Sequence, residues 1–316
     1  MKERLRLDFM DHDYFLDLSN NPEKYYQEPF RIAGNLYFIG SKEIGCYLID
    51  SGEGLIILDT GFDFSASQLI DSIWRLGFDP KDTKMIFHTH LHHDHTAVTK
   101  FLVRLSGAKT YMGKPDAEDM IASIEKNGPS LCEFIPDVQT VDGDEFTLGN
   151  VTIRCYDTPG HSRGNQSFFF NVTDGDKQYV AALHGGLGIN TLHWNFMQKT
   201  GYTTAREEFL SWIDRFNDWK VDIYLGSHVI QGYMIEKREY QLAHPGTNPF
   251  IDPEEWNRVL TIAKEMCYEL IEDEKEGKVA VVYEGDPSRD HGAYPKVVRY
   301  DGKEEPEYKY QYRGTE

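Results

Sequence analysis

The sequence contains few cysteines, and their spacing indicates neither a metal site nor a disulfide framework. Four occur in 316 residues, and no two of them form a CxxC pair. A chain of this length can bury a large core without disulfides. We therefore expect four buried or partly buried thiols with no joint chemical role, at Cys46, Cys132, Cys155 and Cys267.

Positive charge is also scarce. The formal net charge is −19 and the isoelectric point is about 5.0. No stripe of lysines and arginines of the kind that binds phosphates is present, so the sequence predicts no nucleic-acid partner. Acidity by itself indicates little more than a surface that keeps a protein dissolved.

Long apolar runs are missing as well. No segment approaches the roughly 18 consecutive apolar residues that cross a membrane, so we expect no membrane association. The first residues, MKERLRLDFMDHDYF, contain no apolar stretch typical of a secretion signal. On this basis we expect a cytoplasmic protein.

Strand patterns and amphipathic helix patterns make up most of the chain. Short β-rich runs crowd together over 35–58 and again over 138–183. Two such blocks favour an α/β fold in which two sheets pack face to face with helices outside them. Helices are predicted over 65–76, 96–105, 114–125, 203–218 and 253–275. We divide the chain into an N-terminal arm (1–28), a central domain (29–275) and a C-terminal extension (276–316).

The C-terminal extension is polar and aromatic, and VAVVY (279–283) is its one clear strand signal. Its tyrosines offer contact area, so one interpretation is docking or a homo-oligomer formed through the terminal extensions. Disorder is the other interpretation. The tyrosines concerned are Tyr294, Tyr300, Tyr308, Tyr310 and Tyr312.

The segment FHTHLHHDHTA (87–97) is the strongest chemical signal in the chain. It holds five of the twelve histidines together with Asp94, and imidazoles with a carboxylate suit zinc. Residues two apart in an extended segment point the same way, so His90 and His92 can meet one metal. A sharp turn after them lets Asp94 and His95 reach a second metal at the start of a helix, where a carboxylate is favoured.

Two other histidines of this segment have different expected roles. An apolar strand runs into the cluster and a helix pattern follows it, which argues against a surface histidine tract. His88 lies one step deeper in the same alternation, so we expect it to support the site. We expect His93 to face the pocket rather than a metal.

Four motifs in this order resemble those of the metallo-β-lactamase superfamily. HLHHDH (90–95) is similar to the HxHxDH motif of that family. The other three are LDTG (58–61), DTPGHS (157–162) and YLGSH (224–228). The resemblance covers about residues 29–275 and implies a four-layered αββα sandwich, here with N- and C-terminal extensions.

The resemblance also implies a set of ligands for two zinc ions, with iron or manganese as alternative metals. Asp59 of the LDTG motif is implied to support the ligands. The implied ligands are His90, His92 and His161 for the first ion and Asp94, His95 and His228 for the second.

Within the superfamily the chain looks closest to the third metallo-β-lactamase subclass. PFRIAGNLYFIG (29–40) and NPFIDPEEW (248–256) both resemble that subclass. Lactonases and related hydrolases place a metal-bridging aspartate after the TPGH strand, but AALHGGLGIN (181–190) contains none. We expect His184 to lie behind the ligands or at the pocket, and His193 to be a pocket residue.

The resemblance implies a reaction as well. Two zinc ions would share a hydroxide that attacks a carbonyl, while Asp94 orients it and Tyr233 donates a hydrogen bond to the developing oxyanion. We therefore expect a binuclear zinc hydrolase with a small-molecule substrate. It would open a cyclic amide or ester, as a β-lactamase does, by a metal-bound hydroxide.

Three other functions stay open at this point. The first is a thioesterase, lactonase or phosphodiesterase of the same fold acting on a cytoplasmic metabolite, against which the missing aspartate argues. The second is an iron-binding redox protein, which would need more acidic ligands. The third is a metal-stabilised scaffold without catalysis, which six filled ligand positions disfavour.

Overall fold

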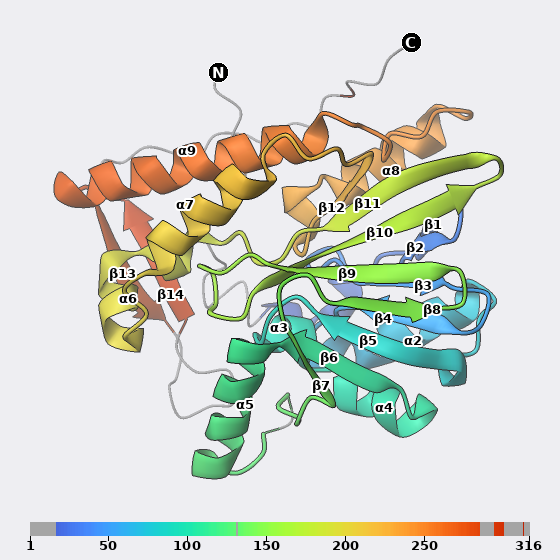
Figure 1. Cartoon of the computed structure of the whole chain (residues 1–316), viewed down its shortest axis with the longest axis horizontal. Coiled ribbons are helices and arrows are strands. Elements are labelled where there is room, and N and C mark those ends of the chain that lie inside the picture. The colour runs from blue at the N-terminus through green and yellow to red at the C-terminus, as the bar shows by residue number, and fades with distance from the viewer. Residues whose placement is uncertain (1–16, 131, 285–293, 300–311, 313–316) are drawn as a thin grey trace.

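The computed structural model describes residues 17–130, 132–284, 294–299 and 312 of the chain (Figure 1). Within them, two β-sheets pack face to face, and helices cover the outer side of each sheet (Figure 1). The α/β class and the four-layered αββα arrangement predicted from the sequence are confirmed. Residues 1–16 of the predicted N-terminal arm lie outside the described residues.

The first sheet has seven strands in the order in which they follow along the chain. They are β1 (Phe30–Ala33), β2 (Leu36–Phe38), β3 (Tyr47–Asp50), β4 (Leu55–Leu58), β5 (Thr83–His88), β6 (Lys109–Gly113) and β7 (Val138–Thr140). The first four strands pair antiparallel, whereas β4 to β7 pair parallel. Parallel pairing puts the carboxyl ends of β4 and β5 at the same edge, and the histidine segment begins there.

The second sheet has five strands in the order β12-β11-β10-β9-β8. They are β8 (Glu145–Leu148), β9 (Val151–Asp157), β10 (Gln166–Asp174), β11 (Lys177–Leu183) and β12 (Ile223–Leu225). Only β11 and β12 pair parallel. His161 lies in the connection between β9 and β10, and His228 follows the end of β12.

Helices α7 (Ala205–Phe216) and α9 (Glu255–Lys275) cover the second sheet, and α2 (Ala66–Arg75) and α4 (Thr99–Ser106) cover the first (Figure 1). The other α-helices are α3 (His93–Thr96), α5 (Lys114–Asn127), α6 (Trp194–Thr200) and α8 (Met234–Ala243). Short 3₁₀ turns are η1 (Pro22–Tyr25), η2 (Asp63–Ser65), η3 (Pro80–Asp82), η4 (Ile189–Leu192) and η5 (Val229–Gln231).

Alternation along the strands explains why three apolar layers form. In β10, Phe168 and Phe170 lie between the two sheets, while Phe169 packs with α7 and α9. In β4 all four residues are buried, because Ile56 lies between the sheets and Ile57 packs with α2 and α4. Both faces of each sheet are therefore covered.

The structure contains elements that the sequence patterns did not predict. Among them are β1, β6, β14, α6 and α8. The predicted helix 96–105 is divided into α3 and α4 by a break at Ala97 and Val98. Helix α8 begins directly after Tyr233, whose backbone is left-handed with φ 50°. Because a tyrosine stands where Ser, Thr, Asp or Asn usually marks a helix start, the sequence gives no signal for this helix.

The C-terminal extension begins with an antiparallel hairpin of β13 (Val279–Glu284) and β14 (Tyr294–Arg299). Strand β13 confirms the strand predicted for 279–283. Tyr312 stacks on Tyr240 of α8 with ring centroids 4.5 Å apart, so this tyrosine contacts its own chain. Tyr300, Tyr308 and Tyr310 lie outside the described residues, and association through the extensions stays a prediction.

Two expectations drawn from composition can be compared directly with the structure. All four cysteines are buried free thiols, as expected. Among the helices of the described residues, none combines the length and the apolar character needed to cross a membrane.

Trp256 of α9 tests how much the layer between α9 and the second sheet stabilises the fold. Its side chain is completely buried, its ring packs against Phe169, and its Nε1 donates to the Phe216 carbonyl oxygen at 3.0 Å. We expect Trp256→Ala to lower the free energy of unfolding by about 3–5 kcal/mol in urea denaturation. Trp74→Ala, at a 53% exposed position, should lower it by less than about 1 kcal/mol. Equal losses in the two variants would contradict this assignment of the core.

Candidate metal centre

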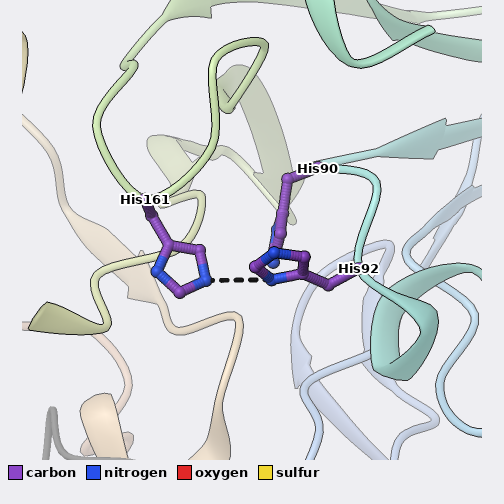
Figure 2. Close-up of side chains that lie close together, drawn as sticks. All are labelled: His90, His92 and His161. Atoms are coloured by element: carbon purple, nitrogen blue, oxygen red, sulfur yellow. Dashed lines mark hydrogen bonds between the residues drawn. The ribbon is translucent and has the colours of Figure 1, made fainter. Parts of the chain in front are cut away.

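The first ligand group, His90, His92 and His161, joins loops from different sheets. His90 and His92 follow β5 of the first sheet, and His161 comes from the β9–β10 connection of the second. Their candidate ligand atoms all lie within 4.8 Å of one another. Figure 2 shows the three rings turned towards each other, with His161 Nε2 3.1 Å from His92 Nδ1.

The second ligand group consists of Asp94 and His95 of α3 together with His228. Its candidate ligand atoms also lie within 4.8 Å of one another. Asp94 Oδ2 is 3.3 Å from His95 Nε2 and 3.5 Å from His228 Nε2. The rings of His90 and His95 are 4.2 Å apart between centroids, so the two groups lie side by side. All six residues predicted as ligands therefore gather in one place.

Two buried ring nitrogens show that these groups suit a cation. His90 Nε2 is buried and has no hydrogen-bond partner, and the buried His95 Nε2 faces the Asp94 carboxylate 3.3 Å away. A buried polar atom without a full set of partners is unfavourable, and one metal ion in each ligand group would satisfy these nitrogens. Five imidazoles and one carboxylate are donors of the kind that zinc prefers. The residues present therefore fit one divalent cation in each ligand group.

Burial keeps four of the histidines neutral. It lowers the pKa of His161 to about 4 and that of His228 to about 3. It also holds the pKa values of His90 and His92 well below the usual range. Because a neutral imidazole offers the lone pair that a metal needs, these four side chains can bind one at neutral pH.

Asp94 and His95 stabilise each other's charged form. Burial alone would lower the pKa of His95, but the carboxylates of Asp94 and Asp59 raise it to about 10. Burial alone would likewise raise the pKa of Asp94, but His95 and the neighbouring histidines hold it well below its usual range. The two carboxylates thus favour positive charge at this place, and a bound cation is an alternative source of that charge.

Asp59 supports ligands of both groups. It is completely buried, and its Oδ2 accepts hydrogen bonds from His95 Nδ1 at 2.8 Å and from Thr89 Oγ1 at 2.7 Å. Thr89 Oγ1 lies 3.0 Å from His90 Nδ1. Because the Thr89 hydroxyl donates its own hydrogen to Asp59, Oγ1 accepts a hydrogen bond from His90 Nδ1–H. Both imidazoles then carry their proton on Nδ1 and leave Nε2 for the site.

A glycine-rich loop after β11 encloses His161. Its Nδ1 donates to the Gly188 carbonyl oxygen at 2.9 Å, which leaves Nε2 for the site. A Cβ atom added at Gly186 would lie 2.1 Å from His161 Cδ2, so only glycine allows this approach. Asn165 fixes the loop, because its Oδ1 accepts from Gly186 N at 2.6 Å and its Nδ2 donates to Thr158 O at 2.6 Å.

A sequence model described as the metallo-beta-lactamase superfamily matches residues 44–174, which include five of the six candidate ligands. The chain is therefore similar to this superfamily over that segment. A solved subclass B3 metallo-β-lactamase of Bradyrhizobium japonicum is 27% identical, with a TM-score of 0.74 over 82% of this chain and 99% of that one. The native FEZ-1 metallo-β-lactamase from Legionella gormanii is 26% identical, with a TM-score of 0.72 over 79% of this chain and 98% of that one. The resemblance to the superfamily and its third subclass is confirmed.

Curated relatives match the chain over shorter segments than the solved structures do. The N-acyl homoserine lactonase AttM of Agrobacterium fabrum is 36% identical over 145 residues, which are 43% of this chain and 53% of that protein. A probable metallo-hydrolase of Burkholderia pseudomallei is 28% identical over 181 residues, 52% of this chain and 58% of that protein. The chain thus spans little more than half the length of these relatives.

His88 and His93 lie close to the ligands without joining either group. His88 is completely buried, with Nδ1 3.1 Å from Tyr111 O and Nε2 2.7 Å from Thr99 Oγ1, which places it behind the site. His93 packs its ring against Phe62 at a centroid distance of 5.4 Å.

His184 and His193 are both buried side chains. His184 is completely buried, and its ring packs against Trp212 at 4.8 Å, behind the loop that encloses His161. His193 is only 3% exposed, and its Nδ1 accepts from Asn195 N at the start of α6. Tyr233 is largely buried too, so its role as a hydrogen-bond donor to substrate stays a prediction.

Sequence patterns missed the residues that hold the ligands. Thr89, Asn165 and Gly186 act through contacts between segments far apart in the chain. Asp116 was missed as well, although an acidic residue in the first turn of a predicted helix is a weak signal. None of these four residues stands at a sequence spacing from the ligands that would have predicted its role.

Gly186 provides a direct test of the loop around His161. We expect Gly186→Ala to weaken zinc binding at least about 10-fold, because the added methyl group displaces the imidazole. Zinc content after dialysis and competition with a chelator would measure the loss. Gly277→Ala is the control, since its Cβ meets no atom within 4 Å although its φ is 68°. Full zinc content in Gly186→Ala would show that the loop does not position His161.

The lowered pKa of His161 predicts acid sensitivity of the metal-free protein. The pKa falls from 6.5 in the unfolded chain to about 4 in the folded one, so the unfolded state binds more protons between these values. Stability from this group is present above pH 6.5 and is lost as the pH falls to about 4, by about 3 kcal/mol. We expect urea denaturation to show that the free energy of unfolding of metal-free wild type falls by this amount more than that of His161→Gln between these two pH values. Parallel pH profiles would contradict the prediction.

Proposed function

We propose that this protein is a binuclear zinc hydrolase that opens a cyclic amide or ester in a small molecule. The convergence of two three-residue ligand groups with donors suited to zinc is the observation that carries the proposal. Similarity to subclass B3 metallo-β-lactamases over nearly their whole length supports it. Zinc bound in such a site lowers the pKa of water and polarises a carbonyl.

The chain's own residues contribute orientation. Asp59 accepts a hydrogen bond from Nδ1 of His95, and the Gly188 carbonyl oxygen accepts one from Nδ1 of His161. The tautomer and the ring direction of both ligands are thereby fixed before any substrate arrives. A site whose groups are fixed in advance needs little rearrangement when charge develops in the reaction.

Asp94 is the single carboxylate among the six ligands, and this sets the charge of the site. It is 4% exposed, and its Oδ2 faces both His95 and His228. Two zinc ions would bring four positive charges against this one negative charge. The remaining positive charge favours substrates whose carbonyl oxygen or leaving atom becomes negative, as in the opening of a lactam or lactone.

A lactone is the second candidate substrate. A named N-acyl homoserine lactonase is 36% identical to this chain over 145 residues, which supports a cyclic ester. The segment 181–190 contains no aspartate, and His184 is buried among tryptophans instead. The absence of a carboxylate in this segment favours the cyclic amide over the ester.

The proposal is tested with purified protein loaded with zinc. We expect two equivalents of zinc by elemental analysis, and turnover of nitrocefin or of an N-acyl homoserine lactone. Removal of zinc with a chelator should abolish turnover, and zinc should restore it. S-lactoylglutathione and bis-p-nitrophenyl phosphate complete the panel, because they represent the thioesterase and phosphodiesterase alternatives.

His90→Ala is the matched control, since it removes one ligand of the first group. We expect its kcat/KM to fall at least about 10³-fold for the substrate that wild type hydrolyses. Lys264→Ala, which removes a surface ion pair with Asp214 on the outer helices, should keep full activity. If wild type exceeds His90→Ala on no substrate of the panel, the proposed ring-opening activity is wrong.

A further inference from the structure

Asp116 is a buried carboxylate that the proposed reaction does not use. It is the third residue of α5, where the positive end of the helix dipole favours a negative charge. The residue is 0% exposed. Nevertheless, no lysine or arginine is among the partners of its carboxylate, which are two backbone amides and one hydroxyl.

These three partners belong to the two loops that carry the first ligand group. Asp116 Oδ2 accepts from Leu91 N at 2.9 Å, and Leu91 lies between His90 and His92. The same oxygen accepts from Ser162 Oγ at 2.7 Å, and Ser162 follows His161. Thus one oxygen atom links a loop of the first sheet to a loop of the second.

The other oxygen secures the second loop again. Asp116 Oδ1 accepts from Gly164 N at 2.5 Å. This close approach needs two glycines, because a Cβ at Gly164 would lie 2.3 Å from Asp116 N and one at Gly113 would lie 2.1 Å from Gly164 O. The backbone around the carboxylate is therefore built to let it reach both loops.

Asp116 is poorly explained as a residue that only stabilises the fold. Burial raises its pKa to about 6, even though all three hydrogen bonds act in the opposite direction. An ionised carboxylate in this environment is therefore less stable than it would be in water. A buried charge that does not favour folding, and that binds two ligand loops, points to a role in the site.

We infer that Asp116 is a positioning residue for the first ligand group, which holds the His90–His92 loop and the His161 loop at the separation that one metal ion requires. The inference rests on the proposed function, since it assumes that these histidines bind zinc. The three hydrogen bonds of Asp116 go to residues outside the second ligand group, so that group should not depend on this carboxylate.

Asp116→Asn tests the inference at nearly constant volume. An amide can accept with only one of its two ends, so either Gly164 N–H or Leu91 N–H then faces an NH₂ group. Asp119→Asn is the matched control on the same helix. Asp119 also binds the second loop, through Arg163 at 2.9 Å, but that ion pair is exposed.

Zinc affinity is measured for each ligand group separately, by competition with a chelator. The His228→Ala background weakens the second group and reports on the first, while the His161→Ala background does the reverse. We expect Asp116→Asn to weaken zinc binding about 10- to 100-fold in the His228→Ala background. In the His161→Ala background the change should stay below about threefold. Asp119→Asn should change neither affinity by more than that.

Cobalt(II) gives a second readout that does not depend on activity. In the His228→Ala background, Asp116→Asn should alter the visible absorption of bound cobalt, because that absorption reports the arrangement of the ligands. Where Asp116→Asn fails to fold by circular dichroism, Ser162→Ala replaces it, since it removes only the hydrogen bond from Ser162 Oγ. Its expected effect on zinc affinity of the first group is about three- to tenfold.

Two results would overturn the inference while leaving the proposed function intact. The first is unchanged zinc affinity of the first group in Asp116→Asn or, where that variant is unfolded, in Ser162→Ala. The second is an equal loss in both backgrounds, which would show that Asp116 only stabilises the fold. If wild type itself binds no zinc, both the inference and the proposed function are wrong.

Discussion

The hydrogen bonds of Asp59 are the interaction on which the metal centre depends. Its carboxylate accepts from His95 directly and orients His90 through Thr89, so one side chain serves ligands of both groups. This geometry follows from the parallel pairing of β4 and β5, which is continued by Asp59 N donating to Phe87 O at 2.9 Å. The left-handed backbone at Asp59, with φ 55°, then turns the chain away from the sheet. Such strain in a residue other than glycine is typical of functional positions.

Burial and charge act against each other throughout this centre, and the outcome differs between residues. Histidines with no close carboxylate partner become neutral, as His161 shows. His95 lies between two carboxylates and keeps its proton in the absence of metal. A cation in the second ligand group must displace this proton, but it then satisfies Asp94 and His95, and a cation in the first group satisfies the unpaired Nε2 of His90. The centre is therefore stable as a polar network only when positive charge is present in it.

Local patterns predicted the parts of the site that lie close together in the chain. The spacing of His90, His92, Asp94 and His95 follows from a strand that ends and a helix that begins, whereas His161 and His228 came from resemblance to the family. Supporting contacts such as those of Asn165 could not be predicted, because they depend on how loops that are separate in the sequence meet in the fold. All five strands between 138 and 183 were predicted from their β-rich runs, while α8 has no start signal and was missed.

The loop that holds His161 explains why the ligand set alone does not fix a substrate. Gly188 and Thr191 of this loop contact His161 Nδ1, and the loop is tied to the end of α9 through Arg206, which donates to Leu192 O at 2.6 Å and pairs with Glu274. This region lies beyond the segment 44–174 that matches the superfamily model. Five of the six candidate ligands lie within that segment, whereas the loop next to His161 is anchored by residues outside it. Because binding loops on a shared scaffold select the ligand, we expect this loop and its anchors, rather than the histidines, to select the substrate.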